Sequence, residues 1–460
     1  MQSSTPVFGS FRDPSGFLFR QDGALYRQVN TVYREHYDRL MSSGLCADLV
    51  RAKLLIPHQE ATVDAPLPDR AYKVLQPERV PFISYPYEWC FSQFKDAALA
   101  TLQIQKTCIE RGMTLKDCSA YNIQFMQGRP VLIDTLSFET YREGQAWVPY
   151  RQFCQHFLAP LALMAHTDVR LSQLLRVYID GLPLDLTSAL LPGRTRLSPT
   201  LLSHIHLHAK SQQHYADKAV DTSVRKMSRL SFLGLVDNLE SAVRGLKWER
   251  QGRWAAYYDE TNYSESGLGH KRRIVGEFLD RLAPGTVWDL GANTGMFSRV
   301  ASAKGAHVIS FDYDPGCVEA NYQQCVEQGE TLVLPLWMDL TNPSPAIGWQ
   351  NQERMALIER GPADTALALA LVHHLAIGNN VPFDHLADFM RTACAAVIIE
   401  FVPKSDSQVQ RLLASREDVF ADYTQQAFET AFRRYFAIQS AVRIADSERT
   451  LYCMTRTAPA

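Results

Sequence analysis

The chain has 460 residues, of which 46% are hydrophobic and 21% charged, with a formal net charge of -2. This length predicts two or three domains, and the near-neutral charge disfavours a general binder of nucleic acid. Nine cysteines without a Cys-x-x-Cys pair favour a reduced, cytoplasmic protein over a disulfide framework or a zinc site. The apolar runs are too short to span a bilayer, so we expect no membrane insertion.

The first part of the chain mixes strand and helix patterns. Residues 16–29 read as a β-hairpin, because two apolar runs flank an Asp22-Gly23 turn. One helical spacing covers residues 32–55, and another covers 92–111. We therefore expect an α+β domain over residues 1–185, followed by a helical connector over 186–250.

A second pattern lies between residues 113 and 139. Asp117 is followed five positions later by Asn122, and then by two short apolar runs that end at Asp134. This resembles the catalytic loop of the protein-kinase and aminoglycoside-phosphotransferase folds. The resemblance implies that Asp117 would orient a hydroxyl nucleophile, whereas Asn122 and Asp134 would hold Mg²⁺ on ATP.

The sequence departs from these families in three places. Leu115 stands where they have His, and Thr135-Leu136 follows the second acid in place of Phe-Gly. No phosphate-binding Lys is found on an N-terminal strand, where Arg27 is the nearest cation. The resemblance therefore implies a degenerate, pseudokinase-like domain, which would use Mg²⁺ and ATP only if it is active. The alternative is a hairpin whose acids cap turns.

Two segments of the connector region carry candidate side chains. His204 and His208 would share one helix face, a spacing that suits a metal, but no carboxylate or cysteine completes a ligand set, so we expect bonded histidines. The aromatic stretch 248–271 follows. Tyr258, Tyr263 and Lys271 stand out in this stretch, and an aromatic interdomain seam is one interpretation of it.

Residues 286–314 form the most informative stretch. An apolar run ends at Asp289, a turn runs from Gly291 through Asn293 to Gly295, and a helical pattern leads to a second apolar run that ends at Asp312. The glycines let the backbone approach a ligand closely, and an acid at the end of a strand can accept hydrogen bonds from ribose hydroxyls. The turn is not Gly-x-Gly-x-x-Gly, which disfavours a dinucleotide. Asp289 and Asn293 suit a ligand with an ammonium group.

The stretch resembles the first motif of class I S-adenosylmethionine-dependent methyltransferases, hydrophobic-x-Asp-x-Gly-x-x-x-Gly, and the resemblance continues over residues 271–457. It implies a seven-stranded Rossmann-like α/β sheet in a methyltransferase domain over 251–460, with S-adenosyl-L-methionine as cofactor. Asp312 would bind the ribose. The preceding stretch 248–271 would help to shape the acceptor pocket, with Tyr258, Tyr263 and Lys271 as the candidate residues. Asp339 follows the third apolar run, over 331–336, and would accept a hydrogen bond from the exocyclic amine of adenine. The backbone amide of Leu340 would face a nitrogen of the adenine ring.

The fourth apolar run, over 365–372, ends in His373-His374-Leu375, a sequence that many small-molecule methyltransferases carry where the methyl group is transferred. An imidazole can take a proton at neutral pH, so His374 or His373 is the leading base, with Glu400 second. Loop histidines that bond to backbone are the alternative for each.

No Asn-Pro-Pro-Tyr sequence follows the fourth run, which favours oxygen over amide or nucleobase-amine methylation. We therefore predict O-methylation of a small-molecule or carbohydrate-type hydroxyl. The alternatives are a bifunctional methyltransferase and small-molecule kinase, and a protein methyltransferase whose N-terminal half recognises the partner. The sequence indicates neither the acceptor nor an oligomeric state.

Overall fold

The structure is a computed structural model that describes residues 4–208, 227–248, 263–414 and 417–457. The chain divides into two compact units. The N-terminal unit comprises Met1–Glu249 and Ile347–Arg354, and the C-terminal unit comprises Arg250–Ala346 and Met355–Ala460. Within the described residues, no helix is both long and apolar enough to cross a bilayer.

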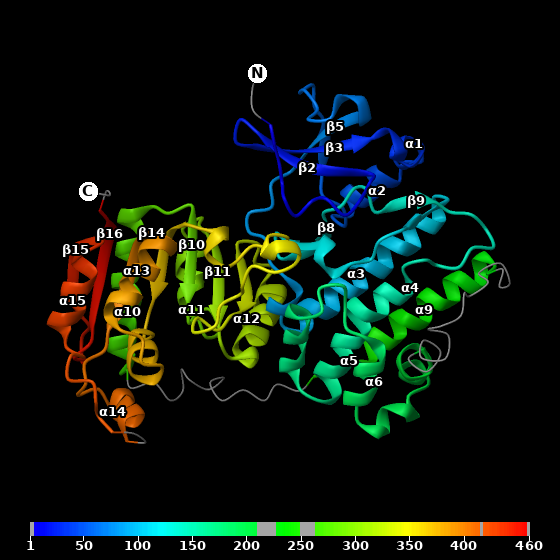
Figure 1. The fold of residues 1–460 in the computed structure, drawn as a ribbon. Coiled ribbons are helices and arrows are strands. Elements are labelled where there is room, and N and C mark those ends of the chain that lie inside the picture. The colour runs from blue at the N-terminus through cyan, green and yellow to red at the C-terminus, as the bar shows by residue number, and fades with distance from the viewer. Residues whose placement is uncertain (1–3, 209–226, 249–262, 415–416, 458–460) are drawn as a thin grey trace. The chain divides into compact units, whose positions relative to one another are not determined.

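The N-terminal unit contains a five-stranded antiparallel sheet in the order β1-β2-β3-β5-β4 and two separate two-stranded sheets, β6-β9 and β7-β8 (Figure 1). Its strands are β1 (Thr5–Pro6), β2 (Gly16–Gln21), β3 (Ala24–Asn30), β4 (His58–Glu60), β5 (Ala71–Pro77), β6 (Met113–Leu115), β7 (Ile123–Met126), β8 (Arg129–Leu132) and β9 (Phe138–Thr140). Its α-helices are α1 (Arg34–Ser42), α2 (Leu45–Arg51), α3 (Phe91–Glu110), α4 (Tyr150–Phe153), α5 (Ala159–His166), α6 (Leu184–Leu190), α7 (Pro199–Leu201) and α9 (Arg229–Gly245). Shorter 3₁₀ and π turns connect them, among them the π turn η8 (Leu202–Leu207).

The predicted N-terminal hairpin is confirmed. Strands β2 and β3 pair antiparallel with Gln21 opposite Ala24, and Asp22 and Gly23 both have positive φ, at 51° and 77°, as a two-residue hairpin turn requires. The helical pattern predicted over 32–55 is confirmed, but not as one continuous helix. The structure has two helices there, because Gly44 adopts φ 78° and ends the continuous helical path between them.

The C-terminal unit is built on one seven-stranded sheet in the order β12-β11-β10-β13-β14-β16-β15. Its strands are β10 (Thr286–Leu290), β11 (His307–Asp312), β12 (Val333–Trp337), β13 (Ala363–Ala368), β14 (Cys394–Phe401), β15 (Phe436–Arg443) and β16 (Thr450–Arg456). Its α-helices are α10 (Glu265–Leu282), α11 (Met296–Ser302), α12 (Pro315–Gln328), α13 (Phe383–Ala393), α14 (Ser407–Leu413) and α15 (Gln425–Arg433), and η12 (His374–Gly378) is a π turn.

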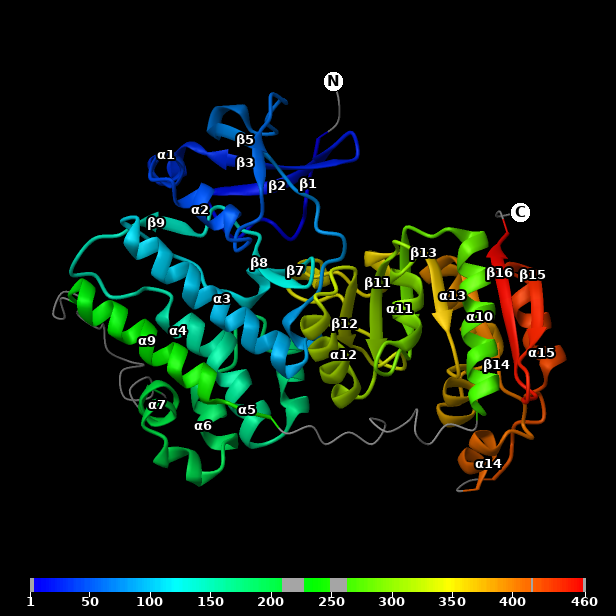
Figure 2. The same cartoon turned by 180° about the vertical axis from the view of Figure 1, so that it is seen from behind.

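The first five strands run parallel, and β16 pairs antiparallel with both β14 and β15. Helices α10 and α11 cover one face of the sheet, and α13 and α15 cover the other, as the two opposite views show (Figures 1 and 2). The predicted seven-stranded sheet with a closing antiparallel pair is confirmed. Strand order reverses between β10 and β13, so a crevice for a ligand is expected at the carboxyl ends of these strands.

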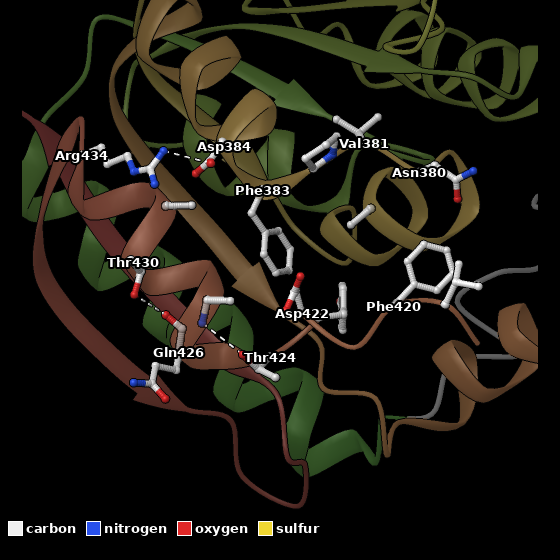
Figure 3. A pocket seen from close by; sticks show the side chains of 16 residues that line it. Asn380, Val381, Phe383, Asp384, Phe420, Asp422, Thr424, Gln426, Thr430 and Arg434 are labelled. Carbon is white, nitrogen blue, oxygen red and sulfur yellow. Dashed lines mark hydrogen bonds and ion pairs between the residues drawn. The ribbon is translucent and has the colours of Figure 1, made fainter.

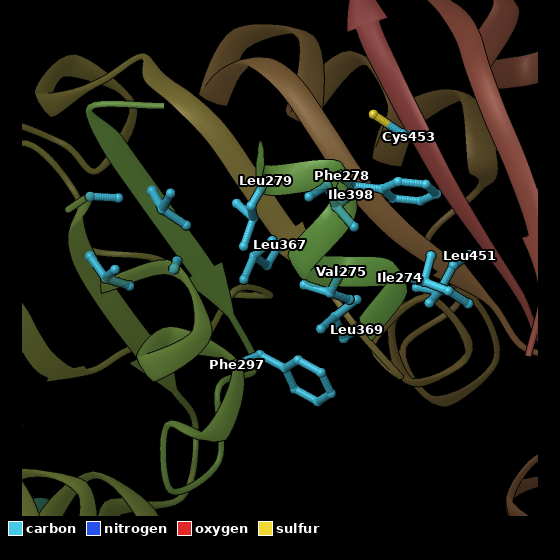
Figure 4. Packing of buried hydrophobic residues seen from close by; sticks show 14 of the residues in the cluster. Ile274, Val275, Phe278, Leu279, Phe297, Leu367, Leu369, Ile398, Leu451 and Cys453 are labelled. Carbon is cyan, nitrogen blue, oxygen red and sulfur yellow. The ribbon is translucent and has the colours of Figure 1, made fainter. Parts of the chain in front are cut away.

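Helix α10 packs against the sheet through an apolar stripe. Ile274, Val275, Phe278 and Leu279 recur at helical spacing and meet strand residues such as Ile398 (Figure 4). Burying each such large apolar side chain stabilises the fold by roughly 1.5–3 kcal/mol relative to leaving it in water. This packing fixes the helix that carries Lys271 against the strands that carry the site.

Strand β13 is shorter than predicted. It ends at Ala368, whereas the apolar run continues to Val372, because Ala370 adopts φ 51° and leaves the extended conformation. The last apolar residues of the run are therefore loop residues, and His373 and His374 lie beyond the end of the strand.

Candidate active site

A cavity of about 470 Å³ lies at the carboxyl ends of the central strands of the C-terminal unit. Its walls come from the turn after β10, the ends of β11 and β12, and the loop after β13. The lining residues are Gly291, Asn293, Asp312, Tyr313, Met338, Asp339, Leu340, Thr341, Leu369, Ala370, Leu371, His374, Leu375 and Asn379. Six residues predicted from the sequence, from four separate segments, thus line one cavity.

The glycine turn is tied to the acid at the end of β11. The backbone N–H of Asn293 donates to Asp312 Oδ2 at 2.6 Å, and the N–H of Asp314 donates to Oδ1 at 2.8 Å. Burial raises the pKa of Asp312 to about 6. Gly291, with φ 77°, brings backbone to the cavity wall.

Gly295 precedes α11 and packs closely against α12. It adopts φ 83°, and a Cβ there would lie 2.4 Å from Asn321 Oδ1. Gly295 is not among the residues that line the cavity. This glycine therefore allows α11 to begin close to the side chains of α12.

Asp289 lies at the end of β10, with 2% of its surface exposed. It accepts a hydrogen bond from Ser298 Oγ at 2.6 Å. Burial raises the pKa of Asp289 to about 7, and the nearby Asp312 carboxylate adds to the rise. Asp289 lines a smaller cavity of about 30 Å³, which also touches Tyr263, Lys271 and the glycine turn.

Asp339 follows β12 and faces the larger cavity. Its Oδ1 accepts from both the backbone N–H and the hydroxyl of Thr341, at 2.8 and 2.7 Å. Both bonds go to one carboxylate oxygen and hold the side chain in one orientation, next to Leu340 on the cavity wall.

The two histidines differ in exposure. His374 lines the large cavity, whereas His373 is completely buried, and the centroids of their rings lie 4.2 Å apart. Among the described residues, neither ring nitrogen of His373 has a hydrogen-bond partner. Burial lowers the pKa of both imidazoles, so both stay neutral at neutral pH.

Glu400 is buried at the end of β14 inside a network of charges. It accepts from Lys271 Nζ at 2.6 Å, from the N–H of Ala370 at 2.9 Å, from Arg449 at 3.4 Å and from the Tyr263 hydroxyl. Burial by itself would raise the pKa of Glu400, but the two cations outweigh burial and lower it. Glu400 is therefore a carboxylate that is already paired.

The network extends to residues that the sequence analysis missed. Arg449 makes a two-bond pair with Asp406, at 2.7 and 3.0 Å. Neither residue belongs to a recognisable motif, and the only signal was an arginine just before the apolar strand β16. Of the three predicted acceptor residues, Tyr263 and Lys271 join this network, and Tyr258 lies outside the described residues.

In the N-terminal unit, two of the three kinase-like positions, Asn122 and Asp134, bond to Ser137. Its hydroxyl donates to Asp134 and accepts from Asn122 Nδ2 at 3.4 Å. Asp117 accepts from Gln152 at 2.7 Å, and its pKa is raised, chiefly by burial with a contribution from Asp134.

Arg27 of β3 forms an ion pair with Asp134. Burial would raise the pKa of Asp134, but Arg27 and the Ser137 hydroxyl outweigh burial, and the pKa is lowered. Within the described ranges, no group of three or more His, Cys, Asp or Glu side chains is placed to hold a metal ion.

Of the two histidines predicted to share a helix face, His204 is hydrogen-bonded, whereas the His208 ring stacks on Tyr150 and its Nδ1 has no hydrogen-bond partner among the described residues. His204 contacts the Tyr150 hydroxyl at 2.7 Å and Asn238 Oδ1 at 2.6 Å. His206 contacts the hydroxyls of Ser188 and Thr195, at 2.7 and 3.0 Å. These rings hold helices of the N-terminal unit together.

The sheet order, the cavity at its switch point and the acids at the ends of neighbouring strands are those expected from the resemblance to class I S-adenosylmethionine-dependent methyltransferases. No family model matches the chain. The chain is 36% identical to the nodulation protein NoeA of Rhizobium meliloti (strain 1021), over 98% of its own length and 96% of the relative's. It therefore belongs to the NoeA family.

Solved structures of methyltransferases resemble parts of the chain. Magnesium protoporphyrin IX methyltransferase (ChlM) from Synechocystis PCC 6803 with bound SAH is 17% identical, over 45% of this chain and 93% of that chain, with a TM-score of 0.31. The N-methyltransferase NodS from Bradyrhizobium japonicum WM9 is 10% identical, over 42% and 99%, with a TM-score of 0.30. The bifunctional kinase-methyltransferase WbdD is 16% identical, over 44% and 42%, with a TM-score of 0.29.

Proposed function

We propose that the C-terminal unit transfers a methyl group from S-adenosylmethionine to a hydroxyl group of a small-molecule or carbohydrate acceptor. One observation carries this proposal. His374, a neutral imidazole, lines the same cavity as the two acids Asp312 and Asp339. The proposed base and the two acids proposed to bind the adenosine therefore line the same cavity.

The residues of the cavity fit the proposed cofactor. Asp312 and Asp339 offer acceptor oxygens for ribose hydroxyls and an adenine amine, at the ends of adjacent strands. Asp289, buried next to the glycine turn, suits the ammonium of an amino-acid head, because a cation would favour the charged carboxylate. When bound, S-adenosylmethionine supplies a methyl group on a sulfonium sulfur, which is already a good leaving group.

The chain must then align the acceptor, exclude water and remove one proton. His374 is the base in this proposal: it takes the proton from the acceptor hydroxyl as the oxygen attacks the methyl carbon. His373 lies directly behind it and, being neutral as well, does not oppose the positive charge that His374 acquires. Glu400, paired with two cations, is the weaker base, and its network instead holds Tyr263 and Lys271 at the smaller cavity.

The test compares binding with turnover. Binding of S-adenosylhomocysteine is measured by calorimetry, and methyl transfer is measured with radiolabelled cofactor on a panel of hydroxylated small molecules and neutral oligosaccharides. We expect His374→Asn to reduce transfer by roughly 10²–10⁴-fold, as for loss of a general base, with binding unchanged. His385→Asn, an exposed histidine on α13 outside both cavities, is the matched control.

Two outcomes would contradict the proposal. Wild-type protein that does not bind S-adenosylhomocysteine would remove the cofactor assignment. A His374→Asn variant with the full rate would remove His374 as the base. If His373→Asn alone abolished transfer while binding persisted, the roles of the two histidines would be exchanged.

The gathering of Asp117, Asn122 and Asp134 motivates a second candidate, phosphate transfer by the N-terminal unit. Their present arrangement does not fit a magnesium site, because Arg27 already pairs with Asp134. We therefore derive no phosphate-transfer step, and recognition of an acceptor or partner is the preferred use of this unit. A rise in melting temperature with ATP and Mg²⁺ that Asp134→Ala abolishes would support the second candidate.

A further inference from the structure

Besides the two cavities of the candidate active site, the C-terminal unit has a larger cavity of about 730 Å³, here called the second cavity (Figure 3). It is formed by the end of η12, the first turn of α13, helix α15 and the loop that precedes α15. This volume is within the range of small-molecule binding sites.

The second cavity shares a wall with the candidate active site. His374, Leu375 and Asn379 line the cofactor cavity, whereas Ala376 and Asn380, from the same short segment, line the second cavity. A ligand in the second cavity would therefore contact the segment that carries the proposed base. One molecule longer than a single ring could extend along this segment.

Aromatic residues contribute to the apolar lining of the second cavity, together with aliphatic residues such as Val381 and Val419. Phe383, Phe420 and Tyr423 are among its lining residues. The Tyr423 ring stacks on Phe401 at 5.5 Å between centroids, and its hydroxyl donates to the carbonyl of Val402 at 2.7 Å, which fixes the ring in place. The faces of such rings are electronegative and attract the weakly positive C–H groups on one face of a pyranose.

The charges that line the cavity disfavour an anionic ligand. Arg434, the cation in the lining, is paired with Asp384 at 2.9 Å. The Asp422 carboxylate has no side-chain partner among the described residues, and Figure 3 shows it in the same space as the Phe383 ring. A phosphate or nucleotide would meet this carboxylate, whereas hydroxyl or ammonium groups could donate to it.

We propose that this cavity binds a pyranose ring of the acceptor, uncharged or amino-substituted, at a distance from the hydroxyl that is methylated. The inference rests on the proposed function and narrows it, because it makes the acceptor a glycan of several rings. Phe383 and Phe420 stack against the sugar face, whereas Tyr423, 5% exposed and stacked on Phe401, supports the wall behind them. Asp422 accepts hydrogen bonds from the hydroxyl or ammonium groups of the sugar.

The experiment measures sugar binding separately from methyl transfer. Cellotetraose, maltotetraose and a glucosamine tetramer are titrated into the full-length protein and observed by saturation-transfer NMR and calorimetry. Thr430→Trp, which places a large ring in the cavity from an exposed position of α15, is compared with Arg433→Trp, an exposed position on the same helix that does not line the cavity. Asp422→Asn removes the charge and keeps the shape.

We expect at least one tetrasaccharide to bind wild type, with affinity reduced tenfold or more in Thr430→Trp and unchanged in Arg433→Trp. Asp422→Asn should weaken the glucosamine tetramer more than the neutral sugars. The proposal is overturned if no tetrasaccharide binds wild type, or if Thr430→Trp leaves the affinity unchanged. Failure of S-adenosylhomocysteine to bind would refute the proposed methyl transfer. The sugar titrations would still test the second cavity, because they do not require the cofactor.

Discussion

Asp289 provides a quantitative test of the cofactor assignment. Its carboxyl group has a pKa of about 7 in the ligand-free protein, because burial disfavours the charged form. If Asp289 binds the ammonium of the cofactor, binding requires the charged carboxylate, and the proton must leave. The substitution Asp289→Asn keeps the shape and the acceptor for the Ser298 hydroxyl but cannot ionise.

The magnitude follows from the pKa. The charged fraction of Asp289 falls from about nine-tenths at pH 8 to about one-tenth at pH 6, which weakens binding of S-adenosylhomocysteine about tenfold, or about 1.4 kcal/mol. Asp312, with a pKa of about 6, adds about a further twofold if its charged form binds the ribose. Wild type should therefore lose about twentyfold between these pH values, and Asp289→Asn only about twofold.

The assay is calorimetry at several pH values, repeated at pH 7 in buffers of different ionisation enthalpy. Wild type should release about half a proton from Asp289 per ligand bound at pH 7, and the variant should lose that release. Glu277→Gln, an exposed acid on α10, is the control and should behave as wild type. A variant that keeps the steep pH dependence would refute the assignment of Asp289 to the ammonium.

Three further predictions concern stability, measured by denaturant unfolding. Glu400→Gln leaves two buried cations without their carboxylate, so unfolding should become easier by roughly 3–5 kcal/mol, and a change below 1 kcal/mol would contradict the buried network. Gly295→Ala should cost more than Gly305→Ala, because both glycines have positive φ but only Gly295 lacks room for a Cβ; equal losses would show that the helix contact yields freely. Arg27→Met should destabilise the N-terminal unit, since it leaves Asp134 buried without its cation. The pKa of Asp134 is lowered in the folded protein, so the stabilisation from this ion pair is fully present above the unfolded pKa of about 3.9 and is lost as pH falls through the folded pKa. The difference in unfolding free energy between wild type and Arg27→Met should therefore become smaller in acid. A difference that stays constant in acid would contradict this pairing.

Much of the candidate cofactor site could be predicted from the sequence because its parts are local. Asp289, the glycine turn and Asp312 occupy one stretch of strand, turn, helix and strand, and the parallel pairing of β10 with β11 brings the two strand ends together. The same logic extends to Asp339 after β12. Each of these positions follows from an apolar run and from what ends it.

The sequence predicted the positions of His373 and His374 less accurately than those of the acids. The apolar run before them predicts a strand to Val372, but the positive φ of Ala370 ends β13 earlier. Which ring faces the cavity depends on the π turn that follows, and adjacent residues in a turn point in different directions. The sequence placed both histidines at the site and could not distinguish the fully buried His373 from the half-buried His374 that lines the cavity.

The sequence by itself determined the seven-stranded sheet and the segment proposed to bind an adenosine, because apolar periodicity and glycine turns act over a few residues. Only the tertiary structure decided the state of Glu400, since its partners Lys271 and Arg449 lie 129 and 49 residues away in the chain. It likewise decided that Arg27 pairs with Asp134, and that a second cavity opens beside the first. Burial and charge pairing join residues that are distant in sequence, and no local pattern records which of them will meet.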